Sequence, residues 1–149
     1  MTRRIIPDVV KDQDILTLPP TATVREAAIA MAKRHVGAVL IIERGKLAGI
    51  FTERDVLNRV LAVAVDPDHT PVSAVMTPRP ATISPSATAI DALRLMQEGR
   101  YRHLPVVDGQ RILGVVSLRD FFGAEFQSIE AEMDMRAAIM EGPGYGRSD

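Results

Sequence analysis

The sequence contains no cysteine and no tryptophan, and it has few aromatic residues of any kind. The lack of cysteine excludes disulfides, thiolate chemistry and cysteine-ligated metal sites. Few aromatic side chains are available for the stacking platforms that bind single-stranded nucleic acid. The formal net charge is only −1 at pH 7, so the chain lacks the basic surface that nucleic acid or an anionic membrane would attract. We therefore expect neither kind of partner.

Long apolar runs are also missing. No stretch approaches the roughly 18 residues that a membrane-spanning helix needs, and no basic-then-apolar leader opens the sequence. We expect a cytoplasmic protein without a membrane anchor. Its 149 residues, of which 46% are hydrophobic, suffice for one compact domain or two small ones with a buried core.

One short motif occurs twice. Gly49-Ile-Phe-Thr-Glu-Arg-Asp55 returns 65 residues later as Gly114-Val-Val-Ser-Leu-Arg-Asp120. This pattern predicts a strand that ends where a helix begins, because Thr or Ser is a preferred N-cap and an acidic residue at N3 completes a capping box. The same junction can also present a hydroxyl and free backbone N–H groups to a ligand. A constant offset between the two copies indicates an internal repeat.

The repeat extends well beyond the motif, since residues 17–57 align with residues 82–122 without a gap. Hydrophobic periodicity predicts the same succession of elements in both halves. Strands are expected at 15–18, 36–42, 47–51, 81–83, 104–107 and 112–116, and helices at 3–11, 23–34, 53–62, 72–76, 87–98 and from 119 onward. A single β-α-β-β-α unit of this size could hardly bury its own sheet. We predict an α/β (α+β) fold in which two such repeats pack about a pseudo-two-fold axis.

The predicted division of the chain follows this pattern. The first repeat covers 7–62, a linker 63–71, the second repeat 72–126, and a C-terminal helix with a flexible tail 127–149. In that last segment, Glu130 to Glu141 carries one weak apolar stripe. Such a stripe fits a solvated terminal helix or a dimer contact equally well.

These residues resemble a known family. The duplicated Gly-h-h-Thr/Ser-x-x-Asp motif, the entry Pro20-Thr-Ala-Thr23 and the strand Arg102-His-Leu-Pro-Val-Val-Asp108 look like a tandem CBS pair, also called a Bateman module. The resemblance implies a non-catalytic regulatory module that needs no cofactor. It further implies that two clefts between the repeats bind adenosine-containing molecules such as AMP, ADP, ATP, NAD or S-adenosylmethionine. In this family the aspartate usually holds the ribose hydroxyls, and the Thr or Ser approaches the phosphate.

Carried over position by position, the resemblance implies two sets of binding residues. The first cleft would be formed by Ile50, Thr52, Asp55, Met76, Pro80, Ala81, Tyr101, Arg102 and His103. The second would be formed by Lys11, Ile15, Leu16, Val36, Gly37, Ala38, Val115, Ser117 and Asp120. Tyr101 has a second interpretation, as an aromatic residue that covers the core.

The two repeats differ in charge at one place. Arg102-His103 stands in the second repeat where the first has Gly37-Ala38. Because a guanidinium can clamp a phosphate, the Asp55 cleft is predicted to prefer strongly anionic ligands. The Asp120 cleft, with Lys11 as its cation, is predicted to suit adenosine or a monophosphate, or to stay empty.

Two catalytic or metal-binding alternatives find little support. The three histidines, His35, His69 and His103, show no ligand spacing. A hydrolase triad of Ser84, His103 and Asp108 would lack a serine in a nucleophile-elbow sequence. An enzyme is therefore not expected.

Two functions remain from the sequence. The first is a module that senses adenylate-type nucleotides, and hence energy state, and acts through a ligand-dependent change in its association with itself or a target protein. The alternative is a structural or interaction dimer with vacant clefts. In either case we expect a homodimer, with apolar residues that follow the two aspartates at the interface, namely Val56, Leu57, Phe121 and Phe122.

Overall fold

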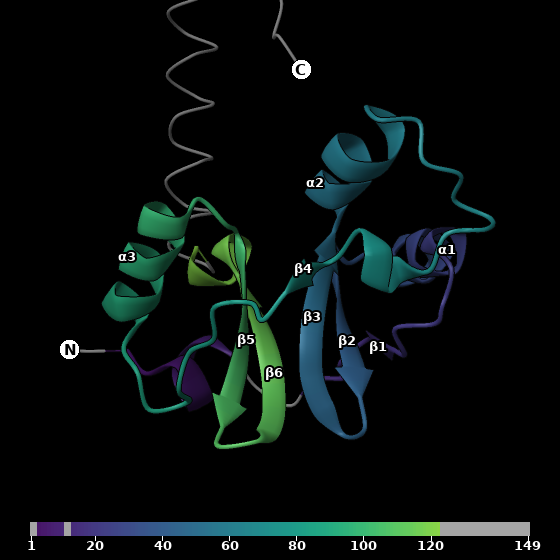
Figure 1. The fold of residues 1–149 in the computed structure, drawn as a ribbon. Helices are drawn as coiled ribbons and strands as arrows, with labels where there is room; N and C mark the ends of the chain where they lie inside the picture. The colour runs from purple at the N-terminus through teal and green to yellow at the C-terminus, as the bar shows by residue number, and fades with distance from the viewer. Residues whose placement is uncertain (1–2, 11–12, 123–149) are drawn as a thin grey trace, which may run out of the picture.

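The protein is described by a computed structural model, which covers residues 3–10 and 13–122 (Figure 1). Two sheets form its centre. The first has four strands in the order β1 (Thr17–Leu18), β2 (Ala38–Glu43), β3 (Lys46–Thr52) and β4 (Thr77–Pro78). The second is the hairpin of β5 (His103–Asp108) and β6 (Arg111–Ser117). The mixed α and β architecture predicted from the sequence is confirmed.

Helices cover the outer sides of these sheets (Figure 1). They are η1 (Ile5–Val9), α1 (Val24–Arg34), α2 (Glu53–Asp55) with its continuation η2 (Val56–Leu61), η3 (Val72–Ala74), α3 (Ala89–Gly99) and η4 (Leu118–Phe121). α1 and α3 begin at equivalent capping boxes, built on Thr23 and Thr88. Both end at a residue with positive φ, His35 at 54° and Arg100 at 58°. The two long helices therefore agree with the prediction to within two residues at each end.

The duplicated motif forms the predicted strand-to-helix junctions. Thr52 caps α2 through a capping box in which its backbone N–H donates to Asp55 at 3.0 Å and its hydroxyl accepts from the Asp55 N–H at 3.2 Å. Ser117 and Asp120 repeat the arrangement at the start of η4, where the Ser117 N–H donates to the Asp120 carboxylate at 2.7 Å. The prediction that helices start at these two residues is confirmed.

The prediction of a continuous helix over residues 3–11 is wrong. Only Ile5–Val9 turns, and Ile6 inside it has extended backbone angles of −119° and 129°. Pro7 explains the interruption, because a proline disfavours helical angles in the residue before it. The strand predicted at 81–83 is reduced to a single parallel bridge between Ile83 and Val106.

Strand β4 was not predicted from the sequence. Thr77 and Pro78 pair antiparallel with Ile50 and Gly49, so the second repeat adds a strand to the sheet of the first. Gly49 permits this close approach, since a Cβ at that position would lie only 2.9 Å from the Thr77 carbonyl oxygen. The sequence did not predict this two-residue strand because prolines stand at positions 78 and 80, and a proline cannot donate a hydrogen bond to a neighbouring strand.

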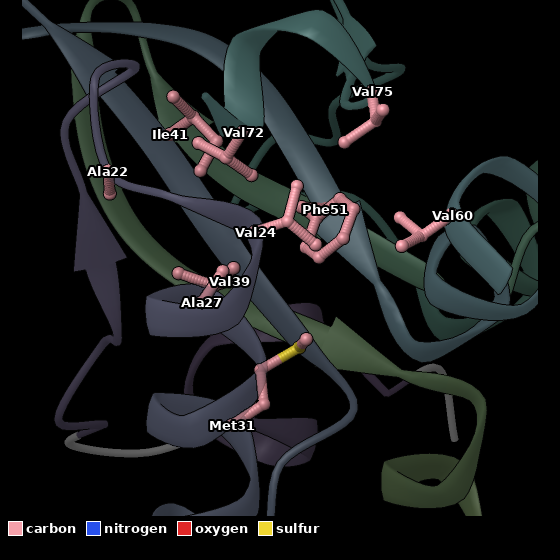
Figure 2. Close-up of a cluster of buried hydrophobic side chains, with 10 residues drawn as sticks. All are labelled: Ala22, Val24, Ala27, Met31, Val39, Ile41, Phe51, Val60, Val72 and Val75. Atoms are coloured by element: carbon pink, nitrogen blue, oxygen red, sulfur yellow. The ribbon is translucent and has the colours of Figure 1, made fainter. Parts of the chain in front are cut away.

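Each repeat contributes its first segment to the core of the other. Val72 and Val75 pack in the first core, beside Val24 and Phe51 (Figure 2). In the opposite direction, Ile5 and Val10 pack in the second core, which consists of Ile5, Val10, Ile83, Ala92, Met96, Leu104, Val106, Val116 and Phe121. The two repeats of the sequence are therefore interlocked in space.

A third apolar cluster joins the two sheets. Ala38, Leu40 and Ile50 of the first sheet are buried against Ile112 and Val115 of the second. The sheets therefore face each other across the pseudo-two-fold arrangement, as the prediction required.

Residues 63–71, the segment predicted as a linker, are bonded to the start of α1. The Arg25 guanidinium forms an ion pair with Asp68, and the Arg25 N–H donates to the Pro67 carbonyl at 3.0 Å. Within the linker, His69 hydrogen-bonds to Asp66 at 2.7 Å. This attachment fixes the direction in which the chain leaves the first repeat.

Several predicted features lie outside the described residues. These are Lys11, residues 123–126 of the second repeat and the predicted C-terminal helix and tail at 127–149, with Glu130 to Glu141. Among helices that the structure does describe, none combines the length and the apolar character that crossing a bilayer demands.

Candidate functional site

A cavity of about 650 Å³ opens between the repeats. It lies where β3 and β6 end and where β2 and β5 begin, at the same end of both sheets (Figure 1). Its walls are formed by Gln13, Asp14, Ile15, Leu16, His35, Val36, Gly37, Ala38, Glu53, Arg102, His103, Val115, Ser117, Leu118, Arg119, Asp120 and Phe122. We call it the Asp120 pocket. Its volume is in the range of small-molecule sites.

Strand pairing brings the polar wall together. In the second hairpin His103 lies opposite Ser117, and the Leu118 N–H donates to the Arg102 carbonyl at 2.8 Å. In the first hairpin Ala38 lies opposite Thr52. The equivalent bond there runs from the Glu53 N–H to the Gly37 carbonyl, at 3.0 Å. Each hydroxyl residue therefore stands beside the first residues of its own hairpin. His103 and Ser117 both line the cavity, whereas in the first hairpin Ala38 and Glu53 line it and Thr52 does not.

Eight of the nine residues predicted for the second cleft line this pocket together. From the first repeat come Ile15, Leu16, Val36, Gly37 and Ala38, and from the second come Val115, Ser117 and Asp120. The ninth, Lys11, lies outside the described residues.

Arg102 and His103 lie elsewhere than predicted. The sequence assigned them to the Asp55 cleft, whereas the structure has both in the wall of the Asp120 pocket. The register of β5 with β6 explains this position, because it sets His103 directly opposite Ser117. Arg119 also lines the pocket, so cationic groups other than Lys11 are present there.

The two aspartates of the repeated motif have different surroundings. Asp55 is 8% exposed, and both of its oxygens are engaged: one accepts from the Thr52 N–H and the other lies 3.5 Å from the Arg59 guanidinium. Asp120 is partly exposed to the cavity. Its Oδ2 accepts from Ser117, while its Oδ1 makes no hydrogen bond within the part of the chain that the structure describes. A free carboxylate oxygen in a cavity can accept hydrogen bonds from a ligand.

The remaining residues predicted for the Asp55 cleft have structural contacts. Arg59, which pairs with Asp55, also donates to the Met76 carbonyl at 2.9 Å. Ile50 is 6% exposed and belongs to the cluster that joins the sheets. Ala81 and Tyr101 pack against the second core, which favours the interpretation of Tyr101 as core cover. Thr52 caps α2 and Pro80 is half-buried.

The Asp120 pocket contains several unpaired charges. Among the described residues, the Arg102 and Arg119 guanidiniums and the Glu53 carboxylate have neither an ion pair nor a hydrogen bond. Burial lowers the pKa of His103 below its usual value, although the Glu53 and Asp120 carboxylates act in the opposite direction. The neutral imidazole therefore predominates at pH 7, and it can donate one hydrogen bond and accept another.

The catalytic and metal-binding alternatives gain no support from the geometry. Within residues 3–10 and 13–122, no group of three His, Asp or Glu side chains is arranged to hold a metal ion. The Ser84 hydroxyl lies 3.0 Å from the Ser86 hydroxyl, and no bond joins it to His103 in the same residues. The hypothetical triad is not assembled.

Two interlocked α+β repeats with a pocket between them define a tandem repeat pair, and comparison with known proteins agrees. The family model of the CBS domain matches residues 4–62 and 72–126. The chain belongs to the CBS domain family, and CBS pairs are regulatory modules.

Several relatives illustrate this relationship. CBS domain-containing protein YhcV of Bacillus subtilis is 38% identical over 106 residues, which are 71% of this chain and 75% of that protein. CBS domain-containing protein CBSCBSPB1 of Arabidopsis thaliana is 38% identical over 104 residues, but these are 69% of this chain and only 19% of the plant protein.

Among solved structures, the CBS domain protein PAE2072 from Pyrobaculum aerophilum complexed with AMP is 28% identical to this chain. Its TM-score is 0.74, and the match covers 88% of this chain and 98% of that one.

Proposed function

We propose that this protein is a regulatory module that binds an adenosine-containing nucleotide in the Asp120 pocket and has no chemistry of its own. The observation that carries the proposal is that the Oδ1 of Asp120, in a cavity of about 650 Å³, has no hydrogen-bond partner among the described residues. A carboxylate can accept two hydrogen bonds from the vicinal hydroxyls of a ribose.

The rest of the wall suits the other parts of such a ligand. Ile15, Leu16 and Val36 provide an apolar surface for a planar base. The Arg102 and Arg119 guanidiniums are available to a phosphate, and charge-assisted bonds of this type are among the stronger polar contacts. The AMP complex of a relative that shares the fold supports the same ligand class.

Ligand retention and thermal shift test this proposal. Absorbance near 260 nm reveals nucleotide that copurifies, because the protein has no tryptophan and two tyrosines. A screen of adenosine, AMP, ADP, ATP, NAD and S-adenosylmethionine follows. A ligand at a hundredfold excess over its Kd stabilises the fold by about 2.7 kcal/mol, which raises Tm measurably. The absence of any shift across this panel, with no copurified nucleotide, would contradict the proposal and favour the vacant-cleft alternative.

We also propose that the module assembles as a homodimer through η2. Leu57 is 59% exposed and Leu61 is 70% exposed, four residues apart on the same helix. Of the other residues predicted for this interface, Val56 packs against the first core, Phe121 is buried in the second, and Phe122 lines the pocket. Sedimentation of wild type and of the double variant Leu57→Glu, Leu61→Glu tests the proposal: we expect a dimer and a monomer, respectively. A wild-type monomer at tens of micromolar would contradict it.

A further inference from the structure

The Asp120 pocket contains a charge that breaks the symmetry of the two repeats. Glu53 directly follows Thr52, whereas the residue directly after Ser117 is Leu118. Both backbone N–H groups make the same bond, to Gly37 and to Arg102 respectively. The two side chains therefore occupy equivalent places in the fold, and both line the pocket. At this position only the first repeat has a carboxylate.

The Glu53 carboxylate lies close to Gly37 and to His103. A Cβ on Gly37 would lie 3.0 Å from Glu53 Oε1 and 3.3 Å from His103 Cε1. Glu53 Oε1 and His103 Cε1 are therefore no farther apart than the sum of these two distances. That separation is shorter than the screening length of about 8 Å at physiological salt. The charge of Glu53 therefore acts on any anion that reaches His103.

The formal charges of the pocket nearly cancel. Asp14 is highly exposed and forms an ion pair with Arg34 at 3.0 Å. Apart from this ion pair, the charged groups of the wall are the Arg102 and Arg119 guanidiniums and the Glu53 and Asp120 carboxylates. The wall also contains the imidazoles of His103 and His35. Two guanidiniums face two carboxylates, so the described residues of the wall leave no net positive charge for a ligand phosphate. Each phosphate added to the ligand therefore meets no uncompensated cation in the described part of the chain and is repelled by Glu53.

We propose that Glu53 sets the ligand charge that the Asp120 pocket accepts, so that the pocket selects adenosine or its monophosphate over the di- and triphosphate. This inference rests on the proposed function. It assigns to Glu53 a role in specificity that needs no contact with the base or the ribose.

Calorimetry of adenosine, AMP, ADP and ATP against wild type and Glu53→Gln tests the proposal. Removal of one charge at this range strengthens binding of an anion about three- to tenfold. We therefore expect adenosine to bind both proteins within twofold, AMP to bind the variant about threefold more tightly, and ATP tenfold or more. Glu53→Leu, which copies the second repeat, should give the same order. Glu43→Gln, at the exposed end of β2, is the matched control and should change nothing.

The possible outcomes separate this inference from the proposed function. If adenosine and AMP bind wild type, but Glu53→Gln changes all four affinities equally or not at all, the inference is overturned and the proposed function stands. If none of the four ligands binds wild type or either variant, both are overturned. Circular dichroism and Tm establish that each variant folds, which we expect because the Thr52–Asp55 capping box does not use the Glu53 side chain.

Discussion

The side-chain amide of Gln13 pairs with the backbone of Val115 in both directions. It donates to the Val115 carbonyl at 2.8 Å and accepts from the Val115 N–H at 2.7 Å. In the first repeat, the residue equivalent to Val115 is Ile50, which is paired instead with the strand residue Thr77. One side chain thus replaces a strand at the edge of the second sheet. Gly114 leaves room for it, since a Cβ there would lie 2.7 Å from the Gln13 oxygen.

Replacement of Gln13 by Ala should expose this edge. The Val115 N–H points away from β5, so it loses its only protein partner among the described residues. Native-state hydrogen exchange should show clearly faster exchange at Val115 and little change at Val116, which is buried beside β5. Global stability should fall by about 0.5–1.5 kcal/mol. Gln110→Ala, in the exposed second hairpin turn, is the control, and equal protection of Val115 in both variants would show that the pairing does not persist in solution.

Asp55 should matter more for stability than for binding. Asp55→Ala removes the acceptor of the Thr52 N–H and the partner of Arg59, which also binds the Met76 carbonyl. Because Asp55 is buried, the free energy of unfolding should fall by about 1.5–3 kcal/mol. Urea denaturation measures the loss. Asp91→Ala removes the equivalent acid from the capping box of α3, where it is exposed, and should cost less; equal losses would argue against the Asp55–Arg59 network.

Arg102 should act on the phosphate of the ligand alone. Replacement by Ala removes a guanidinium that has no protein partner in the described part of the chain, so we expect AMP to bind about tenfold more weakly and adenosine to be unaffected. Calorimetry of both ligands measures the difference. The sequence assigned this phosphate contact to the Asp55 cleft, whereas we now expect it in the Asp120 pocket, whose wall contains Arg102. Equal losses for the two ligands, or none for either, would contradict a phosphate contact.

The pKa values of His69 and His103 should lie on opposite sides of the ordinary value of about 6.5. The hydrogen bond with Asp66 raises the pKa of His69, whereas burial lowers the pKa of His103. NMR titration of the imidazole protons measures both. Asp66→Asn should bring His69 back towards 6.5 without moving His103. A His103 midpoint at or above 6.5 would contradict its burial.

The His103 shift also has a consequence for stability. A folded pKa below the unfolded value means that the unfolded chain binds more protons in the interval between them. The contribution of neutral His103 to stability is therefore complete above about 6.5 and is lost as pH falls from there towards the folded pKa. For the same reason, any tightening of AMP binding by protonated His103 should begin below this pH, once protonation of the phosphate has been subtracted.

Local signals in the sequence located most of the fold. A cap at Thr21 or Thr23 and the repeated motif predicted where three helices begin, because these boundaries depend on residues within one turn. Eight of the residues that line the Asp120 pocket followed from the family resemblance. These features depend on short stretches of chain that behave alike in both repeats.

Several particular contacts between the repeats were not predicted. Strand β4 exists only because Thr77 meets Ile50, and Ile5 reaches the second core only when the repeats interlock. The pairing of Gln13 with Val115 could not be recognised from hydrophobic periodicity in the sequence, because a single side chain makes both hydrogen bonds. Arg102 was assigned to another cleft for a similar reason: the register of β5 with β6 sets its place, and composition does not specify register.

The central claim is that Asp120 holds the ligand in the pocket, and calorimetry of AMP against wild type and Asp120→Ala tests it most directly. The loss of charge-assisted hydrogen bonds to the ribose should weaken AMP by about 2–4 kcal/mol, or roughly 30- to 1,000-fold. Asp108→Ala, in the β5–β6 hairpin and outside the pocket, should bind AMP as wild type does. An unchanged Kd for AMP in a folded Asp120→Ala protein would contradict the claim.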